Sequence, residues 1–215
     1  MKPRYYPSRE EFARLCRRGN MVPVYRQLMA DALTPVLAFE KLEPDEHAFL
    51  LESTSGPEKI GRYCFLGSGP FALFQSAGRQ VTIRDGEGER TYTVDNPLEE
   101  FRDYLGRFSF VHLEELPRFA CGAVGYMGYD VVRFVEELPD CPPDDRGVAD
   151  IVFMFYDQIV IFDHLNKTIK VVCSQRVDGM SAEEAYDSAV ATIENTICLL
   201  YTSPSPRDLS TARMP

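Results

Sequence analysis

The sequence predicts an α+β fold, with largely antiparallel β-sheets and flanking helices. Two observations support this class. Apolar runs of strand length outnumber the helical patterns along the chain, and most consecutive runs are joined by short polar turns of the hairpin kind. Strands that follow one another in this way, with helices set apart from them, are typical of the α+β class.

The composition is that of an ordinary globular protein. The 215 residues are 45% hydrophobic and 26% charged, with a formal net charge of −10, which suits one large domain or two small ones. The acidic balance argues against nucleic acid, although a single arginine can still bind a small anion. The sequence contains no run of about 18 apolar residues, so no membrane span is expected. The N-terminal segment lacks the apolar core of a signal peptide.

The cysteines favour a reducing compartment. They form no CxxC pair, and no histidine stands at zinc-site spacing from them. We therefore expect free thiols in a cytoplasmic protein. The six positions are Cys16, Cys64, Cys121, Cys141, Cys173 and Cys198.

The N-terminal elements are a short helix and a series of strands. Ser8 and Glu11 form a capping box at the start of the helix, and Gly19 ends it. A further apolar run precedes the break at Thr34-Pro35, and two runs that flank a polar segment are predicted as neighbouring strands, followed by two more. These runs are 22–28, then 35–39 and 48–53, then 62–67 and 71–76.

The middle of the chain predicts a hairpin and a helix. Alternating apolar residues between Val81 and Val94 flank the turn DGEG. Asn96 and Pro97 then begin a helix with an apolar face of Leu98, Phe101 and Leu105.

The C-terminal half predicts a glycine-rich strand, a helical segment, a long hairpin and a last helix. The loop 140–150 separates the helical segment from the long hairpin. The turn of this hairpin is 164–167. Ser181 and Glu184 open the last helix, which carries apolar residues on one face as far as Ile197. The other segments are 119–130, 131–139 and the two hairpin strands 151–163 and 168–174.

The C-terminal segment Cys198 to Pro215 differs from the rest. Back-translation of CLLYTSPSPRD resembles read-through into the adapter of a transposase-based sequencing library; the alternative is a natural Pro/Ser-rich linker. We therefore expect one domain over residues 1–197, a disordered tail over 198–215, and a truncated reading frame.

The stretch LLESTSGPEKIGRYCFLG, residues 50–67, contains the candidate binding residues. Glu52 and Ser53 stand where one strand meets a loop, and Arg62 stands where the next strand begins. A free amino acid is a zwitterion that needs donors for its carboxylate and acceptors for its ammonium, and these three side chains supply both. The alternative is a structural Glu52–Arg62 ion pair and a serine that merely ends a strand.

Other candidate sites are weaker. GAVGYMG has a glycine at every third position, which favours close backbone packing over phosphate binding because the G-x-G-x-x-G order is missing. No nucleophile motif, carboxylate pair or metal cluster stands out, so no catalytic or metal-binding residue is predicted. The histidines His47, His112 and His164 lie far apart in the sequence, and His164 is predicted in a hairpin turn.

Three ordered motifs resemble anthranilate synthase component I, of the chorismate-utilising enzyme family. They are LLESTSGPEKIGRYCFLG, GAVGYMGYDVVRFVEELP and DIVFMFYDQIVIFDHLNKTIKVV, and the resemblance covers about residues 8–197. Two positions depart from the family signature: Pro57 stands where a second glycine is usual, and Cys64 where serine is usual. Cysteine keeps the size of serine but hydrogen-bonds more weakly.

The resemblance implies an enzyme that converts chorismate and ammonia, or glutamine through a glutamine amidotransferase subunit (component II), into anthranilate and pyruvate with Mg²⁺. It implies that the chorismate and Mg²⁺ residues belong to a C-terminal domain not contained in this sequence. It also implies an L-tryptophan feedback site in the present part, with Ser53 as a ligand contact and Glu52 beside it; Arg62 is added from its position alone. The fragment itself is expected to be inactive. Aminodeoxychorismate synthase component I, another chorismate-utilising relative and a stand-alone amino-acid-binding module are the alternatives.

Overall fold

The structure, a computed structural model, describes residues 4–30, 33–42, 47–52, 61–139, 143, 144 and 146–202. The chain divides into two compact units that are each discontinuous in sequence. Unit 1 comprises Met1–Gly69, Ser109–Cys121 and Asp157–Pro215, and unit 2 comprises Pro70–Phe108 and Gly122–Tyr156.

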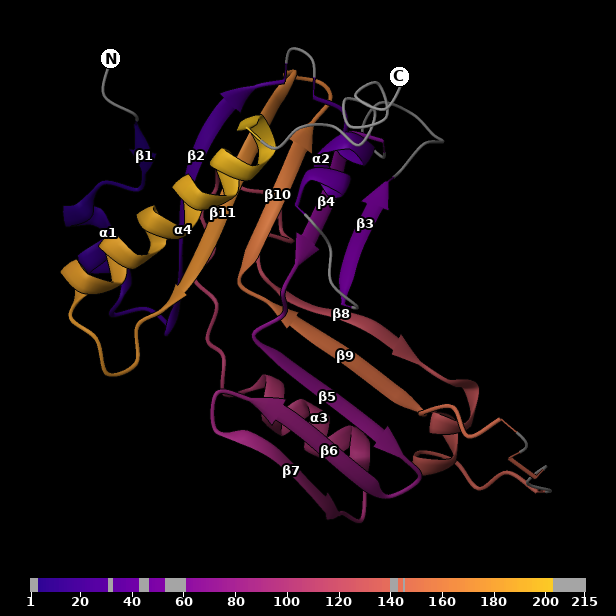
Figure 1. The fold of residues 1–215 in the computed structure, drawn as a ribbon. Helices are drawn as coiled ribbons and strands as arrows, with labels where there is room; N and C mark the ends of the chain where they lie inside the picture. The colour runs from indigo at the N-terminus through magenta and orange to yellow at the C-terminus, as the bar shows by residue number, and fades with distance from the viewer. Residues whose placement is uncertain are drawn as a thin grey trace, which may run out of the picture. The chain divides into compact units, whose positions relative to one another are not determined.

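Within the described residues, the strands of unit 1 form a six-stranded sheet in the order β1-β2-β11-β10-β4-β3 (Figure 1). Neighbouring strands are antiparallel throughout, which confirms the predicted class. The centre of the sheet is apolar, because β10 and β11 are almost entirely buried. The strands are β1 (Tyr5–Tyr6), β2 (Met21–Met29), β3 (Ala48–Glu52), β4 (Tyr63–Ser68), β10 (Gln158–Asp163) and β11 (Thr168–Arg176).

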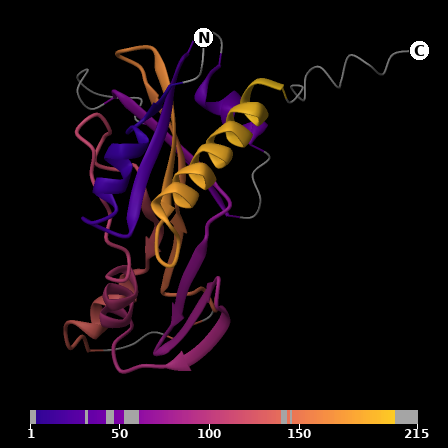
Figure 2. The ribbon, with the colours of Figure 1, turned by 90° about the vertical axis from the view of Figure 1, so that its left-hand side faces the viewer.

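Helix α4 (Ala182–Thr202) lies along one face of this sheet, over β2 and β11 (Figures 1 and 2). Its fully buried residues include Ala189 and Ile193. Helix α1 (Arg9–Leu15) packs beside it and begins at Ser8, whose hydroxyl accepts from the Glu11 amide as the capping box predicts. Among the residues that the structure describes, no helix is long and apolar enough to cross a membrane.

In the described part of unit 2, the strands form a five-stranded sheet in the order β7-β6-β5-β9-β8. Helix α3 (Pro97–Leu105) packs on this sheet through aromatic side chains (Figure 1). The Phe74 and Phe101 ring centroids are 5.2 Å apart, as are those of Tyr104 and Phe155. The strands are β5 (Ala72–Ala77), β6 (Gln80–Asp85), β7 (Gly88–Thr93), β8 (Gly122–Met127) and β9 (Ile151–Tyr156).

The glycine-rich strand β8 allows close backbone packing. A Cβ atom at Gly125 would lie 1.8 Å from the carbonyl oxygen of Val152 on β9, which is far inside van der Waals contact. Only glycine fits there. This geometry supports the interpretation as a packed strand and gives no sign of a phosphate cradle.

The predicted strand at 35–39 is wrong, because the structure places helix α2 (Pro35–Lys41) there. The hydroxyl of Thr34 accepts from the Leu37 amide at 3.2 Å, and Pro35 occupies the first helical turn. Both are helix-start signals. They outweigh the strand-like composition of a short apolar run, which periodicity alone cannot assign.

Two further predictions needed correction in their extent. The run 151–163 was expected as one strand, but it breaks at Asp157, so that β9 belongs to the sheet of unit 2 and β10 to the sheet of unit 1. The helical segment expected at 131–139 is a short 3₁₀ helix, η1 (Tyr129–Phe134). Periodicity assigns the type of an element but not the sheet that it joins.

Helix α4 continues past Ile197 to Thr202. Leu200 is 1% exposed, and the Tyr201 hydroxyl donates to the Met29 carbonyl at 3.4 Å. The expected disorder therefore does not hold for residues 198–202, while residues 203–215 lie outside the described residues. The assignment of this tail as adapter-encoded stays a prediction.

Replacing Leu200 by alanine is expected to lower the free energy of unfolding by about 2–5 kcal/mol, because a buried leucine leaves a cavity. Leu199→Ala is the matched control: it changes the same residue type on the same turn, but Leu199 is 39% exposed. We expect it to cost less than half as much. Urea denaturation followed by circular dichroism measures both. Equal losses would show that the end of α4 does not pack as described.

Candidate functional site

Two of the three predicted binding residues lie in the described structure. Glu52 is the last residue of β3, and Arg62 directly precedes β4, its antiparallel neighbour. Cys64 is the register partner of Glu52. Ser53 lies outside the described residues, so its role stays a prediction.

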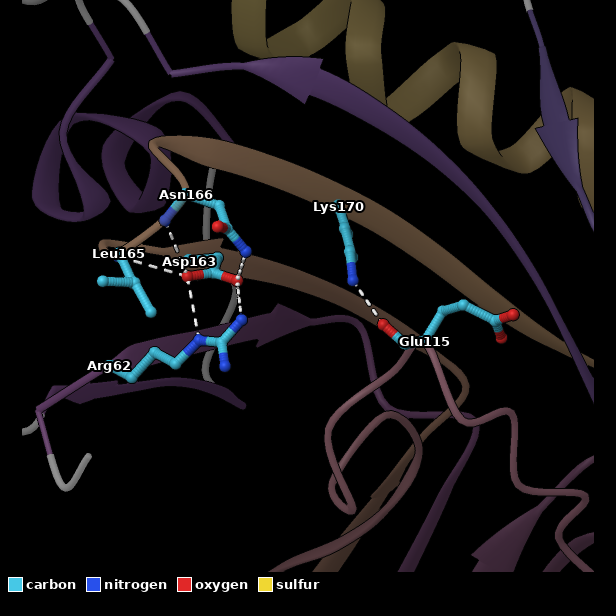
Figure 3. Close-up of polar contacts among 6 residues, drawn as sticks. All are labelled: Arg62, Glu115, Asp163, Leu165, Asn166 and Lys170. Carbon is cyan, nitrogen blue, oxygen red and sulfur yellow. Dashed lines mark hydrogen bonds and ion pairs between the residues drawn. The ribbon is translucent and has the colours of Figure 1, made fainter.

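Arg62 pairs with Asp163 and not with Glu52. Its Nε donates to Asp163 Oδ1 at 3.1 Å and its Nη2 donates to Oδ2 at 2.7 Å (Figure 3). The Asp163 side chain is 1% exposed and that of Arg62 is 32% exposed. A two-point pair of this kind fixes the plane of the guanidinium as well as its position. The structural Glu52–Arg62 ion pair considered above is thus not formed.

Asp163 also holds the turn between β10 and β11. Its carboxylate accepts from the backbone amides of Leu165 and Asn166, both at 3.1 Å, and from the Asn166 side-chain amide at 2.8 Å (Figure 3). These donors and Arg62 together satisfy both oxygens of a buried charge. Burial alone raises the pKa of the Asp163 carboxyl, but the Arg62 and Asn166 donors outweigh it and hold the pKa below its ordinary value.

Lys170, on β11, is a buried cation that the sequence analysis missed. It is 9% exposed, its ammonium donates to the Glu115 carbonyl (Figure 3), and it lies 5.6 Å from the centroid of the Tyr25 ring. Burial lowers the pKa of Lys170, while the charge of Asp163 opposes that shift. The sequence feature that could have revealed Lys170 is a lysine inside the apolar run TIKVV. For Asp163, the feature is an aspartate at the start of a turn.

The strand register separates these side chains onto two faces of the sheet. Ile161 is the partner of both Phe65 and Lys170, and Asp163 lies two residues further along β10, so these residues share one face. Glu52 and its partner Cys64 share the opposite face. The structure therefore brings Arg62 together with Asp163 on the Lys170 face but does not bring Glu52 to them.

The Lys170 face combines charge with aromatic surface. Arg62 stacks over the Tyr63 ring at 4.7 Å, and the rings of Phe65 and Phe119 are 5.5 Å apart. Leu51, on the same face of β3, is 46% exposed. Cationic donors, a carboxylate and aromatic rings are the groups that a free aromatic amino acid requires.

A magnesium site is not found in the part of the chain that the structure describes. There, no group of three or more His, Cys, Asp or Glu side chains is arranged to hold a metal ion. The described residues therefore do not fit the Mg²⁺ that the resemblance implies, and no step that uses it is assigned to them.

Asp163→Asn is expected to lower the free energy of unfolding at pH 7 by about 2–3 kcal/mol, because it leaves Arg62 without its charged partner. The pKa of Asp163 is lower in the folded state than in the unfolded state. The ionised carboxylate therefore stabilises the folded state fully above the unfolded pKa of about 3.9, and this stabilisation is lost as the pH falls through the folded pKa. The difference between the two proteins should therefore shrink below about pH 4.

The matched control is Asp187→Asn, which removes the carboxylate of the exposed Arg9–Asp187 pair. Side chains that are 55% and 61% exposed should contribute far less than the buried pair, because solvent screens their interaction. Urea titrations between acid and neutral pH test both variants. A pH-independent difference for Asp163→Asn would contradict the assigned charge pair.

Comparison with known proteins places this arrangement in a family. The family described as chorismate binding enzyme matches residues 46–213, more than half of the chain. Anthranilate synthase component 1 of Acetivibrio thermocellus is 38% identical over 190 residues, which cover 88% of this chain and 38% of that protein. The protein of the same name from Pseudomonas aeruginosa is 36% identical, with coverages of 93% and 41%.

The fold gives the same result. The crystal structure of anthranilate synthase component I from Streptococcus pneumoniae superposes with a TM-score of 0.51 at 25% identity, covering 84% of this chain and 38% of that one. The chain thus spans about two fifths of the length of these relatives. With the family match, these similarities identify the chain as a member of the chorismate-binding enzyme family and a partial-length homologue of anthranilate synthase component I.

Proposed function

We propose that this chain is the N-terminal, tryptophan-sensing part of an anthranilate synthase component I. The observation that carries the proposal is the 38% identity to the Acetivibrio thermocellus protein of that name over 88% of this chain. The relatives from Pseudomonas aeruginosa and Aquifex aeolicus have the same name. These names favour anthranilate synthase over aminodeoxychorismate synthase.

The parent enzyme, in this proposal, makes anthranilate and pyruvate from chorismate and ammonia, the latter also supplied from glutamine by a component II subunit. The chemistry, with Mg²⁺, belongs to the part of the relatives that this chain does not span. The chain's own role is regulation by L-tryptophan in tryptophan biosynthesis. The described Cys16 and Cys173 are free thiols, which agrees with a cytoplasmic protein.

The proposed sensor is the loop between β3 and β4 together with the Lys170 face. Ser53 is the proposed hydroxyl contact to the zwitterion. Asp163 engages Nε and Nη2 of Arg62, so the Nη1 donors are the ones directed away from that carboxylate and suited to a ligand carboxylate. An arginine held in place beforehand loses little conformational entropy when it binds.

Glu52 has a weaker geometric basis in this sensor. Its carboxylate lies on the face of Cys64, opposite Arg62 and Asp163. We keep Glu52 as the proposed neighbour of the ligand ammonium because Ser53 follows it directly. Asp163 is fully engaged by its donors and positions Arg62 instead of binding ligand.

The 215-residue chain alone should form no anthranilate from chorismate, ammonia and Mg²⁺. The reason is that its described residues offer no metal cluster, and the chain spans only about two fifths of its relatives. Anthranilate fluorescence provides a sensitive assay, with a reaction lacking protein as the blank. Turnover that survives repurification would overturn the proposal that catalysis requires the part of the relatives that this chain does not span.

Ser53→Ala should weaken tryptophan inhibition about ten- to hundredfold in an enzyme completed with the C-terminal part of a relative. A hydrogen bond to a charged ligand group is worth about 1.5–3 kcal/mol, which corresponds to that factor in affinity. Turnover without tryptophan should stay within about twofold of that of the unsubstituted enzyme, because such a factor corresponds to a change of less than about 0.5 kcal/mol in the activation free energy.

Ser109→Ala is the matched control, because Ser109 is exposed and its recorded hydrogen bonds use only its backbone. It should alter neither inhibition nor turnover. If Ser53→Ala instead abolished turnover and left inhibition unchanged, Ser53 would belong to the chemistry and the sensor assignment would fail.

A further inference from the structure

A thiol, an imidazole and a carboxylate meet on the face of the sheet opposite Lys170. The Cys64 sulfur lies 2.9 Å from Nε2 of His164 and 3.8 Å from Oε1 of Glu52. Cys64 comes from β4, Glu52 from β3, and His164 from the turn after β10. The tertiary structure thus brings together three reactive groups, of which the proposed sensor uses only Glu52.

The sheet holds this cluster in place. Glu52 and Cys64 are register partners on β3 and β4, and Phe162, two residues before His164, is the register partner of Cys64 on β10. The His164 amide donates to the Arg62 carbonyl at 2.9 Å, which ties the turn to the start of β4. The imidazole is therefore aimed at the sulfur by backbone pairing on both sides.

The sulfur is covered, but its partners face solvent. Cys64 is 2% exposed, whereas Glu52 and His164 are exposed. A hollow of about 210 Å³, lined by Phe162, His164 and Lys167 among others, lies on the imidazole side. The hollow thus reaches the imidazole that contacts the sulfur.

The other buried thiol, Cys173, has a different environment. It lies on β11 and interacts with the Thr192 side chain of α4. Burial raises the pKa of its thiol well above the ordinary thiol range. No such imidazole contact is recorded for it among the described residues. Cys173 is thus an internal reference for a buried thiol without a recorded imidazole contact.

We propose that Cys64 is a peroxide-sensitive modification site, with His164 as its proton acceptor. The co-reactant is a hydroperoxide such as hydrogen peroxide. The sulfur attacks the terminal peroxide oxygen, so that an S–O bond forms and the O–O bond breaks. The sulfur loses two electrons and the peroxide gains them. The thiol proton passes to His164 Nε2 and then to the departing hydroxide, which leaves as water.

The product would alter the strand pair that leads into the loop carrying Ser53. A sulfenic acid adds an oxygen atom to a side chain that is 2% exposed and packed against Glu52. A serine at position 64 could not undergo the reaction, because an alcohol oxygen does not form a sulfenic acid. The proposed site does not depend on the proposed tryptophan sensor.

The test is sulfenate trapping on the full 215-residue chain without tryptophan. The reduced protein is treated with hydrogen peroxide in the presence of dimedone, and the label on each cysteine is followed with time by peptide mass spectrometry. Cys64 should be labelled at least about tenfold faster than Cys173, the gain that a positioned base provides at minimum. Equal rates at the two sites would overturn the proposal.

Two variants with opposite expected effects separate chemistry from misfolding. His164→Gln should slow labelling of Cys64 by about tenfold or more, while the exposed Cys198 keeps its rate. Glu52→Gln should speed labelling about fivefold, because it removes a negative charge 3.8 Å from the sulfur. Misfolding would instead raise labelling at Cys173 as well. An unchanged rate at Cys64 in His164→Gln would refute the assigned role of the imidazole.

Discussion

The carboxylate of Asp163 joins the start of β4 to the β10–β11 turn of the six-stranded sheet. It is 1% exposed, and it accepts hydrogen bonds from the arginine before β4 and from two residues of the β10–β11 turn. A buried charge is tolerated only when its lone pairs are satisfied and an opposite charge is close. The start of β4 and the turn after β10 must therefore adopt their positions together, although Arg62 and Asp163 are 101 residues apart.

This constraint organises both faces at that end of the sheet. On one face it orients the Arg62 guanidinium near Lys170 and the aromatic rings of Tyr63 and Phe65. On the other face the same turn carries His164 to the sulfur of Cys64. One buried pair thus positions residues of the proposed amino-acid sensor and, on the reverse side, of the proposed thiol site. Strand alternation keeps the two chemistries apart, since neighbouring residues point to opposite faces.

The chain spans only part of its relatives, so its function is described for that part alone. It belongs to the chorismate-binding enzyme family, but it spans about two fifths of the relatives it matches. Regulation can reside in such a piece while catalysis requires the remainder, because a sensing site needs only a few oriented donors and acceptors. The described residues supply those donors and contain no metal cluster.

The sequence by itself determined the class of the fold, its hairpins, the capped helices and the family, because alternation, capping residues and ordered motifs are local signals. Local signals also located Glu52 at the end of β3 and Arg62 directly before β4. Tertiary structure decided what those residues contact. The run 35–39 became a helix through Thr34 and Pro35, and the run 151–163 was divided between two sheets at Asp157. The pairing of Arg62 with Asp163, and of Cys64 with His164, joins residues about a hundred positions apart. These partners depend on the pairing of β4 with β10, and the pattern within either strand does not specify which distant strand it pairs with.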